Sequence, residues 1–547
     1  MSLQILWARL IGVTNEQAAA LMRTSFTPIV REVGDLSAAV FDRRGRMLAQ
    51  AVTGTAGHIN ALATGMRHFL AAHPAGTLRE GDVLITNDPW MTSGQLNDLS
   101  VVTPVFAAGR LVGFFGNCCH AIDIGGRGLS ADASEVFEEG LQIPITKLYR
   151  EGTPNEELFR LLRANVRAPE EVLGDLHAQV AGNQVGADRL VRYLEEFGLS
   201  DLEELGDEIV GRSELAMRAA VAGIPDGDYH QVCHTDGLDE PVRIEVTLRV
   251  RGEAIEADFT GSSAQVERAF NVVLNYTAAY TNYALKCALC PDVPHNDGSF
   301  HPVRVTAPEG SIFNPRFPAA VAGRQIAGHF IPHAIFGALA GVLPDRVIAE
   351  GAGGIWLTTV RGRGSSGPED RFVSVFFAAG GTGARPELDG LAATAFPSGV
   401  ATAPAEVIET TGPLVIRRKE LRRDSGGPGR MRGGLGQTIE VEVRSRAPSV
   451  VSVLSDRFLE GARGYAGGRA GARAGFSADG RARNPKLSLP LPPGARFTLR
   501  LPGGGGFGDP REREPARVRE DLREGLISRR AAAADYGLRQ TRRPRRQ

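Results

Sequence analysis

Cysteine is scarce in this chain, and its scarcity excludes one large class of proteins. Only five of the 547 residues are cysteine, at positions 118, 119, 233, 287 and 290. They form no even, regular framework of the kind that stabilises small secreted domains. We therefore expect a cytoplasmic protein that works in a reducing compartment.

Long apolar runs are also missing. No segment approaches the about 18 uncharged apolar residues that would suggest a transmembrane helix. The first 26 residues carry Arg9, Glu16 and Arg23 at helical spacing. They lack the basic start, the apolar run and the small-residue cleavage site of a signal peptide. The sequence thus predicts neither a membrane span nor an export signal.

The chain has no excess of charge of one sign. Lysine and arginine number 62 against 63 acidic residues, so the formal net charge is -1. Such a balance gives no overall field that would attract nucleic acid or an anionic membrane. The basic stretch at residues 542–546 is expected to be a solvated tail. We predict no nucleic-acid partner and no membrane partner.

Glycine and proline, in contrast, are abundant and spread along the whole chain, with 67 and 32 residues. This distribution indicates many tight turns rather than disorder. The predicted fold class is α+β, a large multilayer body of mixed and antiparallel sheets with packed helices and a β-rich, glycine-dense C-terminal part. The predicted domains are 1–225 (α+β), 226–400 (mixed β/α), 401–515 (glycine-rich β) and 516–547 (a helix and the basic tail).

Apolar periodicity places several helices. The pattern predicts a helix over residues 5–24, a strongly helical region over 155–198 and a further helix over 200–223. Breaks in the second of these regions are expected at Pro169 and Gly174.

One hairpin carries the most informative chemistry. The apolar runs 99–106 and 111–115 flank a turn at residues 107–110. Counting outward from this turn puts Asp98 opposite Cys119 or, with a one-residue bulge, opposite His120. A second hairpin is expected around a turn at residues 42–45, and Asp35 precedes its first strand as Asp98 does in the other.

A carboxylate and an imidazole at the end of a rigid ribbon suit a divalent metal or general acid and base catalysis. Asp88 and Asp123 lie just outside the same end. The alternative is a strand end with polar residues that have no catalytic or metal-binding role. The pattern alone leaves both interpretations open.

The remaining histidine and cysteine patterns are weaker. His58, at the start of a helix, is expected to bond to backbone rather than to act as a ligand. His329 and His333 are four apart on an apolar helix without an acidic companion, which favours a structural or substrate-facing role. Cys287 and Cys290 are expected to be core thiols rather than a metal pair.

Two glycine-dense strings in the C-terminal third, RRDSGGPGRMRGGLG and LPGGGGFGDP, do not fit a nucleotide-binding motif. They lack the strand, loop and helix context of a P-loop or of a dinucleotide-binding turn. We expect their glycines to permit close approach of backbone at tight turns or at an interface.

Taken together, several strings resemble the hydantoinase B/oxoprolinase family in the same relative order over residues 9–537. They are REVGDLSAAVFDRRGRML, NDPW with GQLND, CHAIDIGG, EEGLQIP, DFTGSSAQV, RVTAPEGSIFNP, RRDSGGPGRMRGGLG and LPGGGGFGDP. The resemblance implies the non-nucleotide, B-type subunit of an ATP-dependent cyclic amide hydrolase. It leaves open two alternatives, a subunit of an acetone or acetophenone carboxylase and a non-catalytic structural subunit.

The resemblance also implies a set of partners. An A-type ATPase subunit is expected to bind ATP and to phosphorylate a lactam, hydantoin or ketone oxygen, in a hetero-oligomer. The B-type subunit is expected to hold a divalent metal, zinc, manganese or iron, that activates water.

The family's metal motifs can be carried over to this chain residue by residue. Asp98 and His120 match metal ligands, and Asp35 and Asp123 match carboxylates that would act as base or as orienting groups. Gln95 stands where the family has a histidine ligand, and its amide oxygen binds zinc or manganese more weakly. Three outcomes remain open: another ligand set that recruits Asp88 or Glu139, a lowered metal affinity, or loss of the metal.

Overall fold

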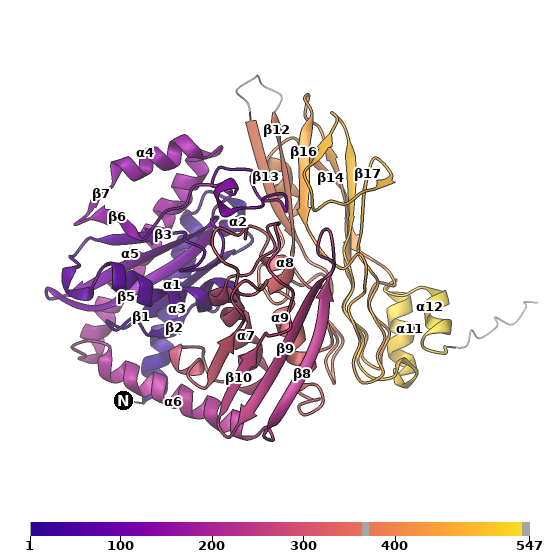
Figure 1. The fold of residues 1–547 in the computed structure, drawn as a ribbon, viewed down its shortest axis with the longest axis horizontal. Coiled ribbons are helices and arrows are strands. Elements are labelled where there is room, and N and C mark those ends of the chain that lie inside the picture. The colour runs from indigo at the N-terminus through magenta and orange to yellow at the C-terminus, as the bar shows by residue number, and fades with distance from the viewer. Residues whose placement is uncertain (1, 364–370, 539–547) are drawn as a thin grey trace, which may run out of the picture.

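The computed structural model describes residues 2–363 and 371–538. Figure 1 shows an N-terminal body of sheet and helices, a middle part packed against it, and two β-sheets formed by the C-terminal third. The predicted α+β class, with antiparallel and mixed sheets and packed helices, is confirmed. Among the helices in these ranges, none is both long enough and apolar enough to cross a membrane. All five cysteines are free thiols.

A seven-stranded antiparallel sheet forms the N-terminal body, in the order β2-β1-β5-β4-β3-β6-β7. Its strands are β1 (Leu36–Phe41), β2 (Met47–Gln50), β3 (Val83–Thr86), β4 (Asp98–Ala107), β5 (Arg110–His120), β6 (Thr146–Arg150) and β7 (Thr153–Pro154). Strands β1, β4 and β5 lie in the middle of the sheet and are buried along most of their length. Their residues are apolar or small along near-continuous runs, as expected for strands that helices cover on both faces.

Six helices belong to this body. They are α1 (Leu3–Thr24), α2 (Pro28–Arg31), α3 (Ala56–Ala72), α4 (Glu156–Asn165), α5 (Pro169–Phe197) and α6 (Glu203–Ala222). The three predicted helical regions are confirmed, and α5 begins at Pro169 as expected. The predicted break at Gly174 is wrong. Gly174 lies inside α5 because the ring of Phe26 packs directly against its α-carbon, where a side chain would collide.

The hairpin predicted from the sequence is β4–β5, and its register is the bulged one. Asp98 pairs with His120, and the register shifts between Val105 and Phe106. The second hairpin is β1–β2, with its turn at residues 42–45. Because β1 also pairs with β5, the two hairpins join edge to edge in one sheet.

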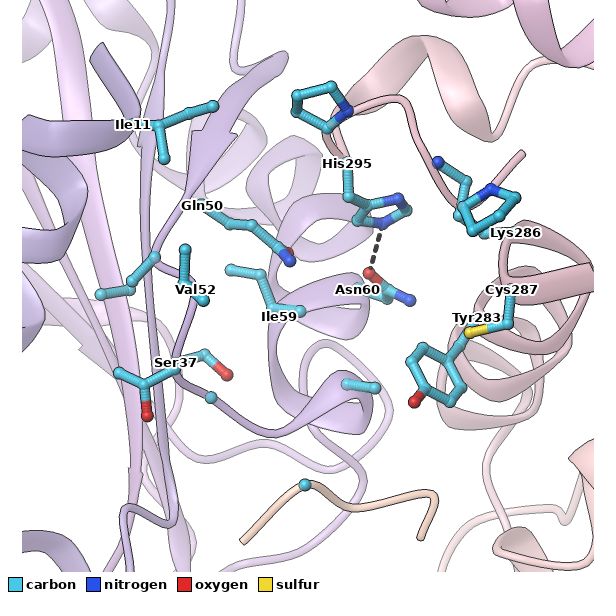
Figure 2. A pocket seen from close by; sticks show the side chains of 18 of the residues that line it. Ile11, Ser37, Gln50, Val52, Ile59, Asn60, Tyr283, Lys286, Cys287 and His295 are labelled. Atoms are coloured by element: carbon cyan, nitrogen blue, oxygen red, sulfur yellow. Dashed lines mark hydrogen bonds between the residues drawn. The ribbon is translucent and has the colours of Figure 1, made fainter. Parts of the chain in front are cut away.

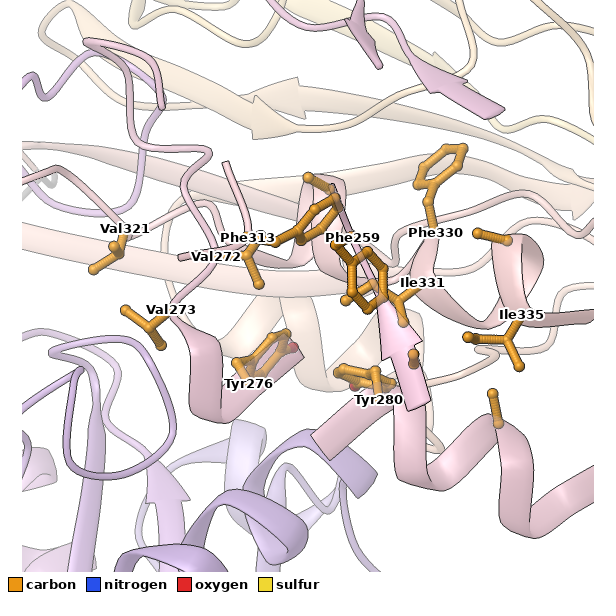
Figure 3. Close-up of a cluster of buried hydrophobic side chains, with 14 of the residues drawn as sticks. Phe259, Val272, Val273, Tyr276, Tyr280, Phe313, Val321, Phe330, Ile331 and Ile335 are labelled. Carbon is orange, nitrogen blue, oxygen red and sulfur yellow. The ribbon is translucent and has the colours of Figure 1, made fainter. Parts of the chain in front are cut away.

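The middle part contains a four-stranded mixed sheet, β11-β10-β9-β8, in which β10 and β11 are parallel. Its elements are β8 (Gly227–Thr235), β9 (Val242–Arg251), β10 (Ala254–Asp258), α7 (Leu274–Leu289), β11 (Val303–Thr306), α8 (Gln325–Gly328) and α9 (Ile331–Leu339). Figure 3 shows the aromatic core between them, including Phe259, Tyr276, Tyr280, Phe313 and Phe330. Each fully buried apolar ring stabilises the fold by about 1.5–3 kcal/mol. Because the same cluster of buried residues includes Val101 of β4, it joins α7 to the N-terminal body.

The C-terminal third is β-rich, as predicted. One sheet has the order β13-β12-β16-β19 and the other β14-β15-β20-β17-β18. The elements are β12 (Trp356–Arg363), β13 (Arg371–Ala378), α10 (Ala405–Thr410), β14 (Leu414–Leu421), β15 (Gln437–Val443), β16 (Ser449–Leu454), β17 (Gly475–Ala478), β18 (Arg481–Ala482), β19 (Leu489–Leu491), β20 (Arg496–Arg500), α11 (Pro515–Arg523) and α12 (Arg529–Ala534).

The predicted domain boundaries stay a prediction. The largest cluster of buried apolar residues includes both Val101 and Phe259, on either side of residue 225. Strand β12 pairs with β16 across residue 400. The predicted basic tail at residues 542–546 lies outside the described residues.

The glycine strings pack backbone directly against backbone. The N–H of Gly504 donates to the carbonyl oxygen of Gly434 at 3.0 Å, and the N–H of Gly434 donates to that of Thr382 at 2.9 Å. A β-carbon on Gly504 would overlap the carbonyl oxygen of Thr382. The prediction that these glycines permit close backbone approach is confirmed.

Gly504→Ala is therefore expected to destabilise the protein by about 3 kcal/mol, the upper end for overpacking, because the clash involves backbone that cannot rotate away. Soluble yield and melting temperature measure the effect. Gly211→Ala in α6 is the matched control, because a β-carbon at Gly211 meets open space. It is expected to raise stability by about 0.5–1 kcal/mol. Equal melting temperatures for the two variants would contradict the packing argument.

Candidate active site

Three neighbouring strands bring three predicted site residues to one end of the large sheet. Asp98 begins β4 and His120 ends β5, and the two are paired. On the other side of β5, Leu36 lies opposite Cys119. Asp35, just before β1, therefore lies beside His120. The backbone N–H of His120 donates to the backbone carbonyl oxygen of Asp35 at 3.2 Å. Sheet register alone gathers Asp35, Asp98 and His120.

The carboxylate of Asp98 is the centre of this cluster. Its side chain is fully buried, and both oxygens are used. Oδ1 accepts from Nδ1 of His120 at 2.9 Å, and Oδ2 accepts from Nε2 of His58 at 3.1 Å and from the guanidinium of Arg324. Burial opposes its charge, but Arg324 and the two histidines outweigh burial and hold the pKa of Asp98 well below its usual range. Asp98 is an anion that binds three donors.

His58 enters the cluster from the first turn of α3. The expectation that it bonds to backbone is wrong, because its Nε2 meets Asp98 and its Nδ1 lies 3.7 Å from Oδ1 of Asp35. Burial lowers the pKa of His58, but the two carboxylates outweigh burial, and the net effect is a raised pKa. Asp35 is itself held by the hydroxyl of Thr55, at 2.9 Å.

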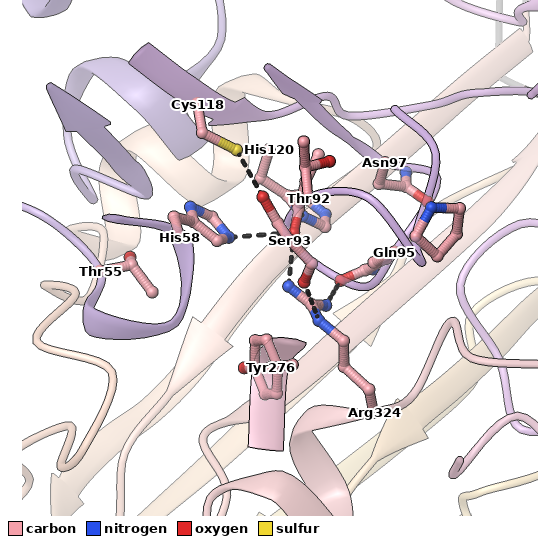
Figure 4. A network of polar contacts seen from close by, with 12 residues as sticks. Thr55, His58, Thr92, Ser93, Gln95, Asn97, Cys118, His120, Tyr276 and Arg324 are labelled. Atoms are coloured by element: carbon pink, nitrogen blue, oxygen red, sulfur yellow. Dashed lines mark hydrogen bonds and ion pairs between the residues drawn. The ribbon is translucent and has the colours of Figure 1, made fainter. Parts of the chain in front are cut away.

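Arg324, which lies just before α8, provides the cluster with a buried positive charge. Figure 4 shows its side chain reaching the loop of Ser93 and Gln95 with Tyr276 beside it. Nε donates to the carbonyl oxygen of Ser93 at 2.6 Å, Nη1 donates to Oε1 of Gln95 and Nη2 to Asp98. The guanidinium also lies over the ring of Tyr276, 4.3 Å from its centroid.

The predicted metal ligands are thus close together, but they do not suit a divalent cation. The oxygen of Gln95 faces a guanidinium, and the oxygens of Asp98 are already shared among three donors. In residues 2–363 and 371–538, no group of three or more histidine, cysteine, aspartate or glutamate side chains is arranged to hold a metal ion. We therefore assign no step of the chemistry to a metal.

Asp88 and Glu139, the alternative metal ligands predicted from the sequence, bond to groups outside the cluster. The carboxylate of Asp88 accepts from the backbone N–H of Trp90 at 2.9 Å and from the side-chain amide of Gln142 at 2.8 Å. The first of these bonds closes the turn that begins at Asp88. Glu139 accepts from two backbone N–H groups of the segment leading to Arg324, each at 2.7 Å. Burial raises the pKa of Glu139 to about 8. Neither carboxylate reaches Asp98.

Asp123, predicted to be catalytic, lies outside the cluster. Its Oδ1 accepts from Nη1 of Arg167 at 2.7 Å, and its Oδ2 accepts from the backbone N–H of the same residue at 2.5 Å. Gly125 and Gly126, both at positive φ, turn the chain away from the strand end. A catalytic role of Asp123 stays a prediction that proximity does not support, whereas Asp35 does lie in the cluster.

A cavity of about 30 Å³ adjoins the cluster, enough for one or two water-sized groups. Its lining includes His58, Gln95, His120, Arg324 and His329. Nε2 of His120 and Nε2 of Gln95 are buried and have no hydrogen-bond partner. Polar atoms without partners at a polar cavity indicate a site for a small polar group.

A second, larger cavity of about 600 Å³ lies nearby. Figure 2 shows its lining, with Asn60 accepting from Nε2 of His295 at 2.7 Å and with Lys286 and Cys287 on the side of α7. Gly54 and Ala56 of this cavity flank Thr55 of the smaller one, and Gly399 lies between Ser398 and Val400 of the smaller one. The two cavities are therefore separated by two thin segments of chain.

The sequence and the fold of the chain match those of known proteins. The sequence profile of the Hydantoinase B/oxoprolinase family matches residues 1–510. The chain belongs to this family. Caprolactamase subunit beta of Pseudomonas jessenii is 30% identical, over 98% of this chain and 96% of that protein. The solved structure of ATP-dependent caprolactamase from the same species has a TM-score of 0.87 and 28% identity, covering 98% of this chain and 95% of that one.

A third relative in the hydantoinase B/oxoprolinase family is larger. 5-Oxoprolinase 1 of Arabidopsis thaliana is 28% identical over 93% of this chain, but the match covers only 42% of that protein. The B-type chain therefore corresponds to less than half of this relative.

The sequence patterns of this hydantoinase B/oxoprolinase chain do not predict Arg324 or Tyr276 as members of the site, and the role they predict for His58 is wrong. A signal for Arg324 was present, because it is a lone charge in the apolar, small-residue segment 319–330. An arginine buried in such a segment needs an anionic partner. His329 was expected to be structural or substrate-facing, and it does line the small cavity, where Tyr280 and Tyr276 bond to its Nε2 at 3.0 and 3.3 Å.

Proposed function

We propose that this chain is the B-type subunit of an ATP-dependent hydrolase of cyclic amides, which works with an A-type ATPase partner in the cytoplasm. The observation that carries the proposal is the buried Asp98–His120 pair at a polar cavity, in a fold shared with an ATP-dependent caprolactamase. The subunit name of the caprolactamase relative and the larger size of 5-oxoprolinase 1 support a separate partner. We assign ATP binding to that partner.

The chemistry explains why a lactam hydrolase would need ATP. Resonance makes an amide carbon a poor electrophile, so water attacks it slowly. Transfer of the γ-phosphoryl group of ATP to the lactam oxygen yields an imidate-like carbon that water attacks more readily. Overall, lactam, ATP and two waters give the amino acid, ADP and phosphate. One water opens the ring and the other releases the phosphoryl group.

His120 is placed to act as the base for water. Its Nδ1–H donates to the ionised Asp98, which leaves the lone pair of Nε2 free at the cavity. A carboxylate that fixes the tautomer of an imidazole in this way is the arrangement of a general base with its orienting group. We assign that orienting role to Asp98. The guanidinium of Arg324 lines the same cavity and is suited to stabilise a developing anionic oxygen.

We propose that the ring of the substrate lies in the larger cavity and that its carbonyl group reaches the cavity beside His120 when the two segments between them, residues 54–56 and 398–400, move apart. Its volume of about 600 Å³ lies in the range of small-molecule sites, whereas the cavity beside His120 admits only water-sized groups. Its lining mixes apolar groups such as Ile59 with polar groups such as Gln50 and Asn60. This mixture suits a small cyclic amide.

Reconstitution tests the proposal. The chain is combined with its A-type partner and Mg-ATP and offered caprolactam, 5-oxoproline, hydantoin and N-methylhydantoin. We expect ring opening of at least one of these compounds with ADP formation in equal amount, and only when both chains are present. Ring opening by this chain without partner and ATP would contradict the proposal. Carboxylation of acetone or acetophenone with bicarbonate, without any ring opening, would instead support the carboxylase alternative.

A further inference from the structure

Arg324 lies where the family resemblance would place a metal ion. Its guanidinium contacts two of the three predicted metal ligands, Asp98 and Gln95, and it lines one cavity with the third, His120. We infer that Arg324 takes the place of the divalent cation, so that this cluster works without a metal. The inference goes beyond the proposed function, because it concerns the charge of the cluster whatever the substrate is.

The loop around Arg324 is shaped to hold an arginine. Gly94 has φ +82°, and a β-carbon there would lie 3.0 Å from Cδ and 3.2 Å from Nε of Arg324. The loop can close over this side chain because residue 94 is glycine. Ser93 supplies the carbonyl oxygen for Nε, and Tyr276 supplies an aromatic face for the cation. Arg324 itself is only 2% exposed.

Gln95 matches Arg324 rather than a metal. Its amide oxygen is a neutral acceptor that suits a guanidinium N–H, and it binds a divalent ion less well than an imidazole does. The contact between Gln95 and Arg324 therefore explains why this chain has glutamine at the position where the family motif has histidine. The residue that would have been a ligand has become a hydrogen-bond partner of the built-in cation.

The donors of the cluster leave no place for a second cation beside Asp98. Nδ1 of His120 and Nε2 of His58 are both directed at that carboxylate, and Arg324 shares one of its oxygens. A guanidinium stays protonated at any pH at which the protein is folded, so a divalent ion next to it would be repelled. The positive charge of Arg324 cannot dissociate as a metal can.

Metal content is the direct test. The purified chain is incubated with excess zinc, manganese or iron(II), desalted, and analysed by inductively coupled plasma mass spectrometry. We expect less than one tenth of a metal ion per chain in the wild type. The variant Gln95→His/Arg324→Ala removes the cation and restores an imidazole, and we expect it to bind about one ion per chain and to melt at a higher temperature with metal than without.

A surface exchange of the same residue types is the control. Gln4→His/Arg23→Ala makes the same exchange on the exposed face of α1 and is expected to bind no metal. About one ion per wild-type chain, lost in Asp98→Asn, would overturn the inference. Absence of binding by both the wild type and Gln95→His/Arg324→Ala would overturn it as well, because removal of Arg324 would then not open a cation site. Failure of the proposed function would appear separately, as absence of ring opening with every substrate.

Discussion

Asp98→Asn is expected to abolish ATP-coupled ring opening and to lower the stability of the protein by about 3–5 kcal/mol, the cost of removing one member of a buried ion pair. Asparagine keeps the size of the side chain and an oxygen that can accept from His120. What it removes is the negative charge that balances the guanidinium of Arg324. Asparagine also replaces Oδ2, which accepts from His58 and Arg324, by an NH2 group, so the loss reports on the charge and on this acceptor rather than on the size of the side chain. Thermal melting and the rate of ring opening measure the two effects.

A double variant tests whether the loss of stability comes from the unbalanced charge of Arg324. Asp98→Asn/Arg324→Gln removes both charges, so its melting temperature is expected to recover much of the loss of Asp98→Asn. Asp207→Asn is the matched control, because Asp207 also pairs with arginine but is 54% exposed. Its effect is expected to stay below about 1 kcal/mol. A melting temperature of Asp98→Asn equal to that of the wild type would contradict the role of Asp98 as counter-ion.

The part of the site that the sequence could predict is the part formed by local strand pairing. The turn at residues 107–110 and the apolar runs beside it fix the register of β4 and β5, and that register brings Asp98 to His120. Asp35 was predicted only through the family resemblance, because the pairing of β1 with β5 that brings it to His120 joins two separate hairpins. Neighbouring residues in a sheet are set by spacing, and spacing is visible in a sequence.

The part that could not be predicted depends on packing between distant segments. Arg324 is 226 residues from Asp98 along the chain, and the aromatic core around α7 positions it. His58 meets Asp98 only because α3 packs against the sheet. Asp123 is close to His120 in sequence, yet glycines at positive φ and the pairing with Arg167 turn it away. Hydrophobic packing is not directional, so no residue spacing in the sequence predicts these contacts.

His120→Gln is expected to lower the turnover number for ring opening by about 10²- to 10⁴-fold, the usual contribution of a general base. Glutamine can still donate an N–H to Asp98, but it has no basic lone pair to offer at the cavity. Because phosphoryl transfer is assigned to the partner, binding of ATP to the complex is expected to persist. The variant is assayed for amino acid formation, for ADP formation and for nucleotide binding.

The split between kinetic constants distinguishes a base from a merely structural residue. We expect the turnover number of His120→Gln to fall while its KM and melting temperature change little, because the large cavity proposed for the ring does not include His120. His234→Gln, on an exposed position of β8, is the matched control and should retain wild-type turnover. Full activity of His120→Gln would contradict the assignment. A fall in melting temperature as large as that of Asp98→Asn would instead assign His120 a structural role beside Arg324.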